Sequence, residues 1–211
     1  MDFVRVNGTV ARTVRRHAGW IVAGLLAIGI LVGVAVHRHH RYKHFAVHEA
    51  GRVYRSAWVD ADVFGELIRK YKIRTVVNLC DPSEKEGLIE SQRRAVQSAG
   101  ARLVELVFPA NHTWDINYRV VHEIEALFDD PSVYPVWIHC QHGRERTVKA
   151  LTIYDIRRRR MNAYDSLESM PRYGMDHPWP VVVFAYNYET RLNSGLCRGI
   201  TQSRSDRGVR R

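Results

Sequence analysis

The longest apolar run in the chain lies near its N-terminus. Residues 18–36 read AGWIVAGLLAIGILVGVAV, nineteen residues without a charge. About 20 such residues span the hydrocarbon core of a bilayer, whereas a buried helix of a globular domain would show polar positions at helical spacing. The run is long for a cleaved signal peptide, and the residues around Ala35 make a poor cleavage site. The pattern predicts an uncleaved, single-pass transmembrane signal anchor.

Beyond this run, strand-like segments alternate with segments of helical periodicity. Short apolar runs bounded by turn residues predict strands over 45–58 (one or two strands with a turn at Gly51), 73–79, 101–108 and 135–139. Apolar residues repeated every three or four positions predict helices over 60–72, 88–100, 116–130, 144–160, 165–174 and 181–192. This alternation predicts an α/β domain with a largely parallel central sheet flanked by helices.

The formal charge of +10 is located in the two ends of the chain. Residues 1–44 carry seven Arg and Lys against one Asp, and residues 197–211 carry five Arg against one Asp, so residues 45–196 are neutral overall. Binding to a phosphate backbone needs a basic face on the folded part. Nucleic acid is therefore not an expected partner, and the basic ends bear on membranes and solubility.

These observations divide the chain into consecutive segments. We expect a basic N-terminal segment at 1–17, the anchor at 18–36, a basic juxtamembrane linker at 37–44, a catalytic domain at 45–196 and a basic, disordered tail at 197–211. More positive charge precedes the apolar run than follows it, by one residue. Positive-inside counting thus favours an internal N-terminus and an extracytoplasmic domain.

The stretch HCQHGRERT, residues 139–147, links the predicted strand 135–139 to the helix that follows. In parallel α/β sheets, ligands bind beyond the carboxyl ends of the strands. A loop there directs backbone N–H groups and a helix N-terminus at one point, which makes an anion site. Gly143 allows a tight turn, Arg146 can grip two phosphate oxygens, and Cys140 at the base of the loop is placed to act as a thiolate nucleophile.

The pattern HCxxGxxR[ST], made by His139, Cys140, Gly143, Arg146 and Thr147, resembles the Cys-x5-Arg phosphatase superfamily, which includes protein-tyrosine and dual-specificity phosphatases. The resemblance extends over roughly residues 50–175, including VYRSA and IRTVVNLCD, and is nearest to the compact dual-specificity-like group of prokaryotes and fungi. Two residues depart from the family pattern. Glu145 replaces a frequent Asp and Val148 a frequent Gly, which leaves substrate preference open.

The resemblance implies a mechanism in two steps. Cys140 attacks phosphorus and forms a phosphocysteine, while Arg146 and the loop amides stabilise the equatorial oxygens. Thr147 helps the thiolate leave in the second step, and His139 has a supporting role behind the loop. The implied phosphate-binding residues are those of the loop itself: Gln141, His142, Gly143, Arg144, Glu145 and Arg146.

The general acid implied by the resemblance is an Asp on another loop. Asp115 follows the predicted strand 101–108 and precedes Cys140 by 25 residues, a spacing similar to that of compact members of the family. Its other interpretation is a cap on the helix that follows. Asp81 is the alternative acid because it also follows a strand.

Several further residues have two interpretations. Cys80, in the sequence NLC, is either a buried small apolar residue or a redox partner of Cys140, as in some lipid phosphatases of this superfamily. Arg157–Arg160 are either solvated at a helix end or in contact with anionic lipid. We interpret Arg55 as a structural ion-pair residue. His112 and His142 flank the pocket without further ligands at metal-binding spacing, so we expect no metal and no cofactor.

The sequence therefore predicts a membrane-anchored, cysteine-dependent phosphatase acting on phosphotyrosine, with phosphoserine and phosphothreonine as further substrates. The enzymatic alternative is a phosphoinositide or inositol-phosphate phosphatase, which cationic Arg144 would suit. A sulfurtransferase of the rhodanese type fits less well, since it needs no acid loop. The non-enzymatic alternative is a phosphate-binding module with little turnover.

Overall fold

The computed structural model of the chain describes residues 7–108, 119–170 and 178–194, with side chains from Trp20 onward. It forms two compact units, Met1–Arg41 and Tyr42–Arg211. The described part of the first unit belongs to the helix α1 (Asn7–Tyr42), whose last residue is counted in the second unit. In α1, the segment Trp20–Tyr42 contains an 18-residue window with a mean hydropathy of 2.3 and is long and apolar enough to cross a membrane.

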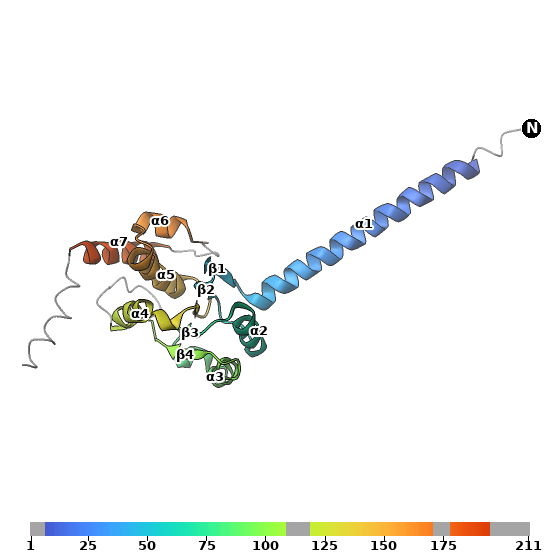
Figure 1. Ribbon diagram of the computed structural model, residues 1–211. Coiled ribbons are helices and arrows are strands. Elements are labelled where there is room, and N and C mark those ends of the chain that lie inside the picture. The colour runs from blue at the N-terminus through green and yellow to red at the C-terminus, as the bar shows by residue number, and fades with distance from the viewer. Residues whose placement is uncertain (1–6, 109–118, 171–177, 195–211) are drawn as a thin grey trace, which may run out of the picture. The chain divides into compact units, whose positions relative to one another are not determined.

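The described part of the second unit is built on a five-stranded sheet of order β1-β2-β5-β3-β4 (Figure 1). Its strands are β1 (Ala46–Glu49), β2 (Val53–Ser56), β3 (Thr75–Asn78), β4 (Arg102–Glu105) and β5 (Val136–His139). Only the β1–β2 pairing is antiparallel, and the other three pairings are parallel. The predicted α/β class with a largely parallel sheet is confirmed.

Helices cover both faces of this sheet (Figure 1). The helical elements of the second unit are α2 (Ala61–Tyr71), η1 (Pro82–Lys85), α3 (Ile89–Ser98), α4 (Arg119–Asp129), η2 (Pro131–Val133), α5 (Glu145–Arg158), α6 (Ala163–Glu168) and α7 (Trp179–Asn193). Helices α2 and α3 contribute to one hydrophobic cluster, and α4 to α7 contribute to the other. Helix α5 is the most enclosed, because every residue from Arg146 to Ile156 is buried.

Successive side chains of the central strands point to opposite faces of the sheet. On β3, Val77 packs against the α4–α7 side and Val76 against the α2–α3 side, and on β5 Ile138 and Trp137 divide in the same way. Side chains alternate across a strand, so a strand buried on both faces reads as a near-continuous apolar run. This requirement explains the apolar residues in the middle of each strand, from which both strands were predicted.

Element boundaries differ from the sequence-based expectations by a few residues. Strand β4 ends at Glu105, and α4 begins at Arg119 within the described residues. Asp60 occupies the N-cap position of α2. Gly100, with φ of +79°, lies directly after the C-cap of α3.

The segment 37–44, expected as a linker, is mostly helical. Helix α1 continues to Tyr42, whose hydroxyl donates a 2.5 Å hydrogen bond to Glu66 on α2. Lys43 forms an ion pair of 2.9 Å with Asp60. The last residues of this segment therefore belong to the folded second unit.

Candidate active site

The stretch HCQHGRERT begins at the carboxyl edge of the parallel strands. In the ladder, His139 at the end of β5 pairs with Ser56 at the end of β2 and with Asn78 at the end of β3. The loop after His139 leads into α5, which begins at Glu145. The loop therefore lies between a strand end and a helix N-terminus, the position at which an α/β sheet binds anions.

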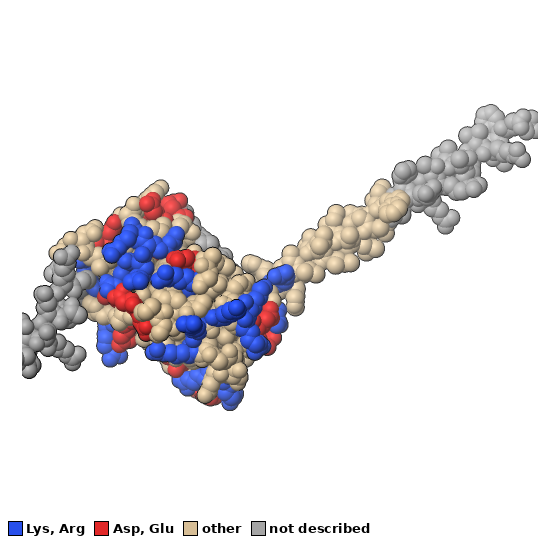
Figure 2. Space-filling view, in the orientation of Figure 1, with Lys and Arg blue, Asp and Glu red and all other residues tan. Residues whose placement is uncertain are grey.

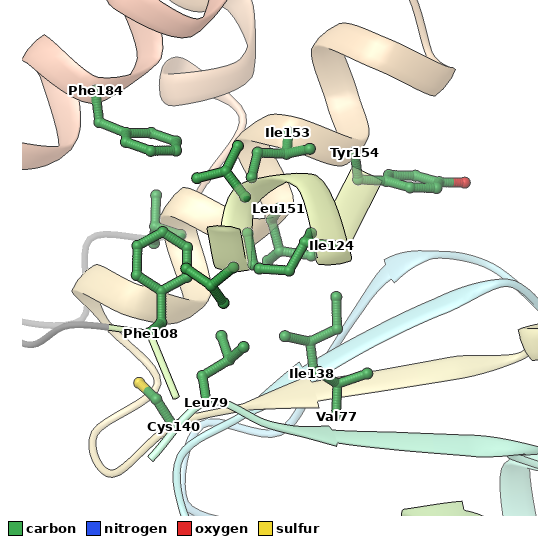
Figure 3. Close-up of a cluster of buried hydrophobic side chains, with 14 of the residues drawn as sticks. Val77, Leu79, Phe108, Ile124, Ile138, Cys140, Leu151, Ile153, Tyr154 and Phe184 are labelled. Atoms are coloured by element: carbon green, nitrogen blue, oxygen red, sulfur yellow. The ribbon is translucent and has the colours of Figure 1, made fainter. Parts of the chain in front are cut away.

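Cys140 lies at the start of this loop. It is 3% exposed and belongs to the cluster of apolar side chains beneath α5, where Figure 3 places it at the margin, beside Leu79. Thr147, in the first turn of α5, donates its hydroxyl to Cys140 Sγ across 3.1 Å. This hydrogen bond ties the sulfur to the first turn of α5.

Arg146 is oriented by an ion pair that the sequence did not indicate. Its Nη1 and Nη2 donate to the two carboxylate oxygens of Glu84, on η1, across 2.6 and 2.7 Å, and Nη1 also donates to the Leu79 carbonyl across 3.3 Å. A guanidinium carries five N–H donors in a planar fork. These contacts with Glu84 and Leu79 run through Nη1 and Nη2, at the end of the fork. A guanidinium also has a second edge, formed by Nε and Nη2, which can donate to two oxygens of an anion.

Gly143 lies close to the backbone at the end of β2. Its φ is +64°, and a Cβ there would lie 2.6 Å from Ala57 N and 2.6 Å from Ser56 O. Arg55 on β2 donates from Nη2 to the Gly143 carbonyl. Arg55 was expected to form a structural ion pair, and this contact shows that it holds the loop through a backbone oxygen.

His139 is held from behind the loop by a chain of buried amides. Gln92 Nε2 donates to His139 Nε2 across 2.7 Å, Asn78 Nδ2 donates to Gln92 Oε1 across 3.3 Å, and Asn78 Oδ1 accepts from Cys80 N across 2.9 Å. Since His139 Nε2 accepts a hydrogen bond, the ring proton resides on Nδ1. Asn78 and Gln92 were not predicted from the sequence as part of the site. Two features of the sequence could have identified them. Asn78 is a polar residue at the end of a buried strand, and Gln92 is a polar residue on the apolar side of a predicted helix.

Burial lowers the pKa of His139 from its ordinary value of 6.5 to about 3. Between these two values the unfolded chain binds a proton that the folded chain does not, so stability is lost as the pH falls through this window. We expect the free energy of unfolding to fall by about 2 kcal/mol more in the wild type than in His139→Gln between pH 7 and pH 5. Urea titrations followed by tryptophan fluorescence measure this difference, and parallel pH dependences would contradict it.

The remaining loop residues differ in their surroundings. Gln141 and Arg144 are partly exposed, and His142 is exposed, with a pKa lowered by desolvation and then by Arg144 and Lys85 nearby. Glu145 accepts a 2.7 Å hydrogen bond from Lys149, one turn further along α5. Glu145 is therefore engaged on its own helix, and the exposed rim of the loop is cationic.

Of the two Asp residues considered as the general acid, the structure describes one, Asp81. Asp115, like His112, lies outside the described residues. Asp81 caps η1, where it accepts from Ser83 N across 2.9 Å and from Ser83 Oγ across 2.7 Å. These hydrogen bonds lower the pKa of Asp81. A carboxylate that is ionised and already accepting hydrogen bonds is poorly suited to donate a proton.

Cys80 and Cys140 are both free thiols in the structure. Cys80 is 1% exposed, and burial raises its pKa to about 12. A buried thiol of this kind stays protonated and attacks a partner slowly. In this conformation Cys80 is better described as a core residue than as a redox partner.

The arginine run at the end of α5 contacts acidic groups of the same domain. Arg157 forms a bidentate pair with Asp129, Arg158 lies 3.5 Å from the same carboxylate, and Arg159 donates to Asp155 across 2.9 Å. On the visible face of the domain, basic and acidic side chains are interspersed (Figure 2). These contacts favour a structural role for the run over one in lipid binding.

A mostly parallel sheet with a cysteine loop between its central strand and a buried helix is the fold of the cysteine-based protein-tyrosine and dual-specificity phosphatases, and the chain has this fold. Neither a protein-family model nor a curated protein sequence matches the chain. Solved structures of this superfamily do match it.

Three of these structures are informative. A mutant form of Tk-PTP is 16% identical, with a TM-score of 0.55 over 71% of this chain and 96% of that one. The catalytic core of the PP-IP phosphatase Siw14 from S. cerevisiae is 18% identical, with a TM-score of 0.54 over 74% of this chain and 92% of that one. PTPMT1 in complex with PI(5)P is 13% identical, with a TM-score of 0.53 over 68% of this chain and 94% of that one.

Proposed function

We propose that this protein is a cysteine-dependent phosphatase that hydrolyses phosphotyrosine on proteins, with phosphoserine and phosphothreonine as further substrates. The observation that carries the proposal is the arrangement around Cys140. Its sulfur accepts a hydrogen bond from Thr147, the loop leads into a helix N-terminus, and the Arg146 guanidinium in the first turn of that helix is held by Glu84. These groups supply a nucleophile and stabilisation for a phosphoryl group in transfer.

The proposed reaction has two displacements at phosphorus. The Cys140 thiolate forms a bond to phosphorus as the bond to the leaving oxygen breaks, and Asp115 gives that oxygen its proton. The Asp115 carboxylate then takes a proton from water, whose oxygen attacks phosphorus and releases the Cys140 thiolate and inorganic phosphate. Arg146 and the loop amides bind the equatorial oxygens in both steps, while Thr147 donates to the departing sulfur.

We propose that the protein is anchored in the membrane by its apolar helix, with the catalytic domain on the extracytoplasmic side. The length and apolar composition of Trp20–Tyr42 support the anchor, and the positive charge that precedes the helix supports the orientation.

The second proposed function is hydrolysis of a phosphoinositide or inositol phosphate. The cationic rim favours it, because Arg144 and Lys85 both lower the pKa of His142 and would also attract additional phosphates of one substrate. Two of the similar structures carry related names, a PP-IP phosphatase and a complex with PI(5)P. Only the fold of those proteins is shared at this level of identity.

A substrate panel on the full chain in detergent micelles tests the proposal. We expect faster hydrolysis of phosphotyrosine peptides than of a phosphoinositide in mixed micelles. The reverse order would favour the second function. An absence of turnover on every substrate, together with binding of tungstate, would favour a phosphate-binding module.

The role of Asp115 makes a separate prediction. Asp115→Asn is expected to lower turnover of a phosphotyrosine peptide by about a hundredfold. The loss should be smaller for p-nitrophenyl phosphate, whose leaving group needs little protonation. In the wild type, activity should fall with rising pH as the acid loses its proton, and this fall should be absent in the variant. Asp81→Asn is the matched comparison, and a larger loss in Asp81→Asn would show that the acid has been assigned to the wrong residue.

A further inference from the structure

Three successive carbonyl groups of the cysteine loop are held by donors from outside the loop. The Gln141 carbonyl accepts from Trp58 N across 3.2 Å, the His142 carbonyl accepts from His44 Nδ1 across 3.3 Å, and the Gly143 carbonyl accepts from Arg55 Nη2. A carbonyl oxygen can only accept, so His44 must carry a proton on Nδ1.

Because peptide groups are planar, these contacts also fix the directions in which the N–H groups of the loop point. In a trans peptide, the C=O of one residue and the N–H of the next point in opposite directions. The carbonyls of residues 141, 142 and 143 point toward donors outside the loop. The N–H groups of residues 142, 143 and 144 therefore point away from those donors. In the site proposed above these amides bind the anion, so the donors outside the loop set the orientation of the N–H groups inside it.

His44 holds the middle peptide of the three, and it lies outside the core of the domain. Together with Lys43 it follows the last residue of α1, and both have left-handed backbone, with φ of +41° for Lys43 and +65° for His44. Non-glycine residues in this region cost free energy and persist only where the surroundings hold them. Here the Lys43 carbonyl accepts from Ala57 N across 2.8 Å, and the Lys43 side chain pairs with Asp60.

We propose that His44 is a positioning residue for catalysis, through which the junction after the apolar helix fixes the peptide between His142 and Gly143 for anion binding. The proposal rests on the phosphatase function proposed above. Its physical consequence is that the competent conformation of the loop becomes less populated when the His44 donor is lost. The apparent affinity for an oxyanion falls by the factor by which that population falls.

Two variants of the full chain separate the hydrogen bond from the backbone strain. His44→Gly removes the donor and adopts positive φ without strain. His44→Asn also tolerates this backbone region, and its amide nitrogen occupies nearly the same place as Nδ1. We expect His44→Gly to raise the Kd for tungstate, measured by isothermal titration calorimetry, about fivefold. The same variant should lower kcat/KM on p-nitrophenyl phosphate by a similar factor. His44→Asn should stay within about twofold of the wild type in both measurements.

A residue that only supports folding would give a different result. It would lower the thermal unfolding midpoint without changing the tungstate Kd of the folded protein, whereas we expect His44→Gly to change Kd with its midpoint unchanged. A wild-type Kd in His44→Gly would overturn the proposal, and so would a His44→Asn variant as weak as His44→Gly. If the wild type binds tungstate without hydrolysing any substrate, the phosphatase function fails and the Kd comparison still decides the role of His44. A wild type that does not bind tungstate overturns both.

Discussion

Replacing Cys140 with serine is expected to abolish turnover while leaving oxyanion binding within a few-fold of the wild type. In the proposed mechanism the variant keeps Arg146 and the loop amides, which would bind the anion, and loses only the nucleophile. We expect kcat on p-nitrophenyl phosphate to fall by about 10⁴-fold or more. Turnover assays and tungstate calorimetry on the same preparation measure the two effects.

A serine hydroxyl needs a base to become a nucleophile, and the surroundings of Cys140 offer none among the described residues. Thr147 donates its hydroxyl toward this position. His139 is neutral because burial lowers its pKa to about 3, and its accepting nitrogen is bound by Gln92. Cys197→Ser, which changes a cysteine near the end of the chain, is the matched control and should retain activity. Full turnover in Cys140→Ser would rule out a phosphocysteine intermediate.

The sequence was sufficient to predict the elements that depend on local pattern. The middle residues of β3 (Val76 and Val77) and of β5 (Trp137 and Ile138) are apolar because both strands are buried on both faces, and this requirement is visible in a single run of residues. The same holds for the cysteine loop, whose glycine, cysteine and arginine lie within seven residues of one another. Local spacing therefore defined both the sheet class and the central position of the site.

The groups that support the loop were not predictable in the same way. Glu84 reaches Arg146 from 62 positions away in the sequence, and His44 reaches His142 from 98 positions away. Each looks like an ordinary polar residue of a loop or linker until the chain is folded. Their roles follow from tertiary contacts with backbone and side-chain atoms, which periodicity and motif spacing do not encode.

The approach of the cysteine loop to β2 leads to the second large expected effect. Gly143→Ala would place a Cβ 2.6 Å from Ala57 N and from Ser56 O, at a residue whose φ is +64°. Both contacts are with backbone atoms, which cannot move aside as a flexible side chain would. We expect the free energy of unfolding to fall by about 3 kcal/mol and kcat/KM to fall by about a hundredfold or more, because the loop must move away from the residues that hold its carbonyls.

Gly100→Ala separates the two causes of this loss. Gly100 has a φ of +79°, yet a Cβ there would meet nothing within 4 Å. The control therefore carries only the cost of the left-handed backbone, about 1 kcal/mol, and should keep wild-type turnover because Gly100 lies at the end of α3, away from the loop. Urea unfolding and turnover of both variants test the argument. If Gly143→Ala were no less stable and no less active than Gly100→Ala, the close packing of the loop on β2 would not be what orients its amides.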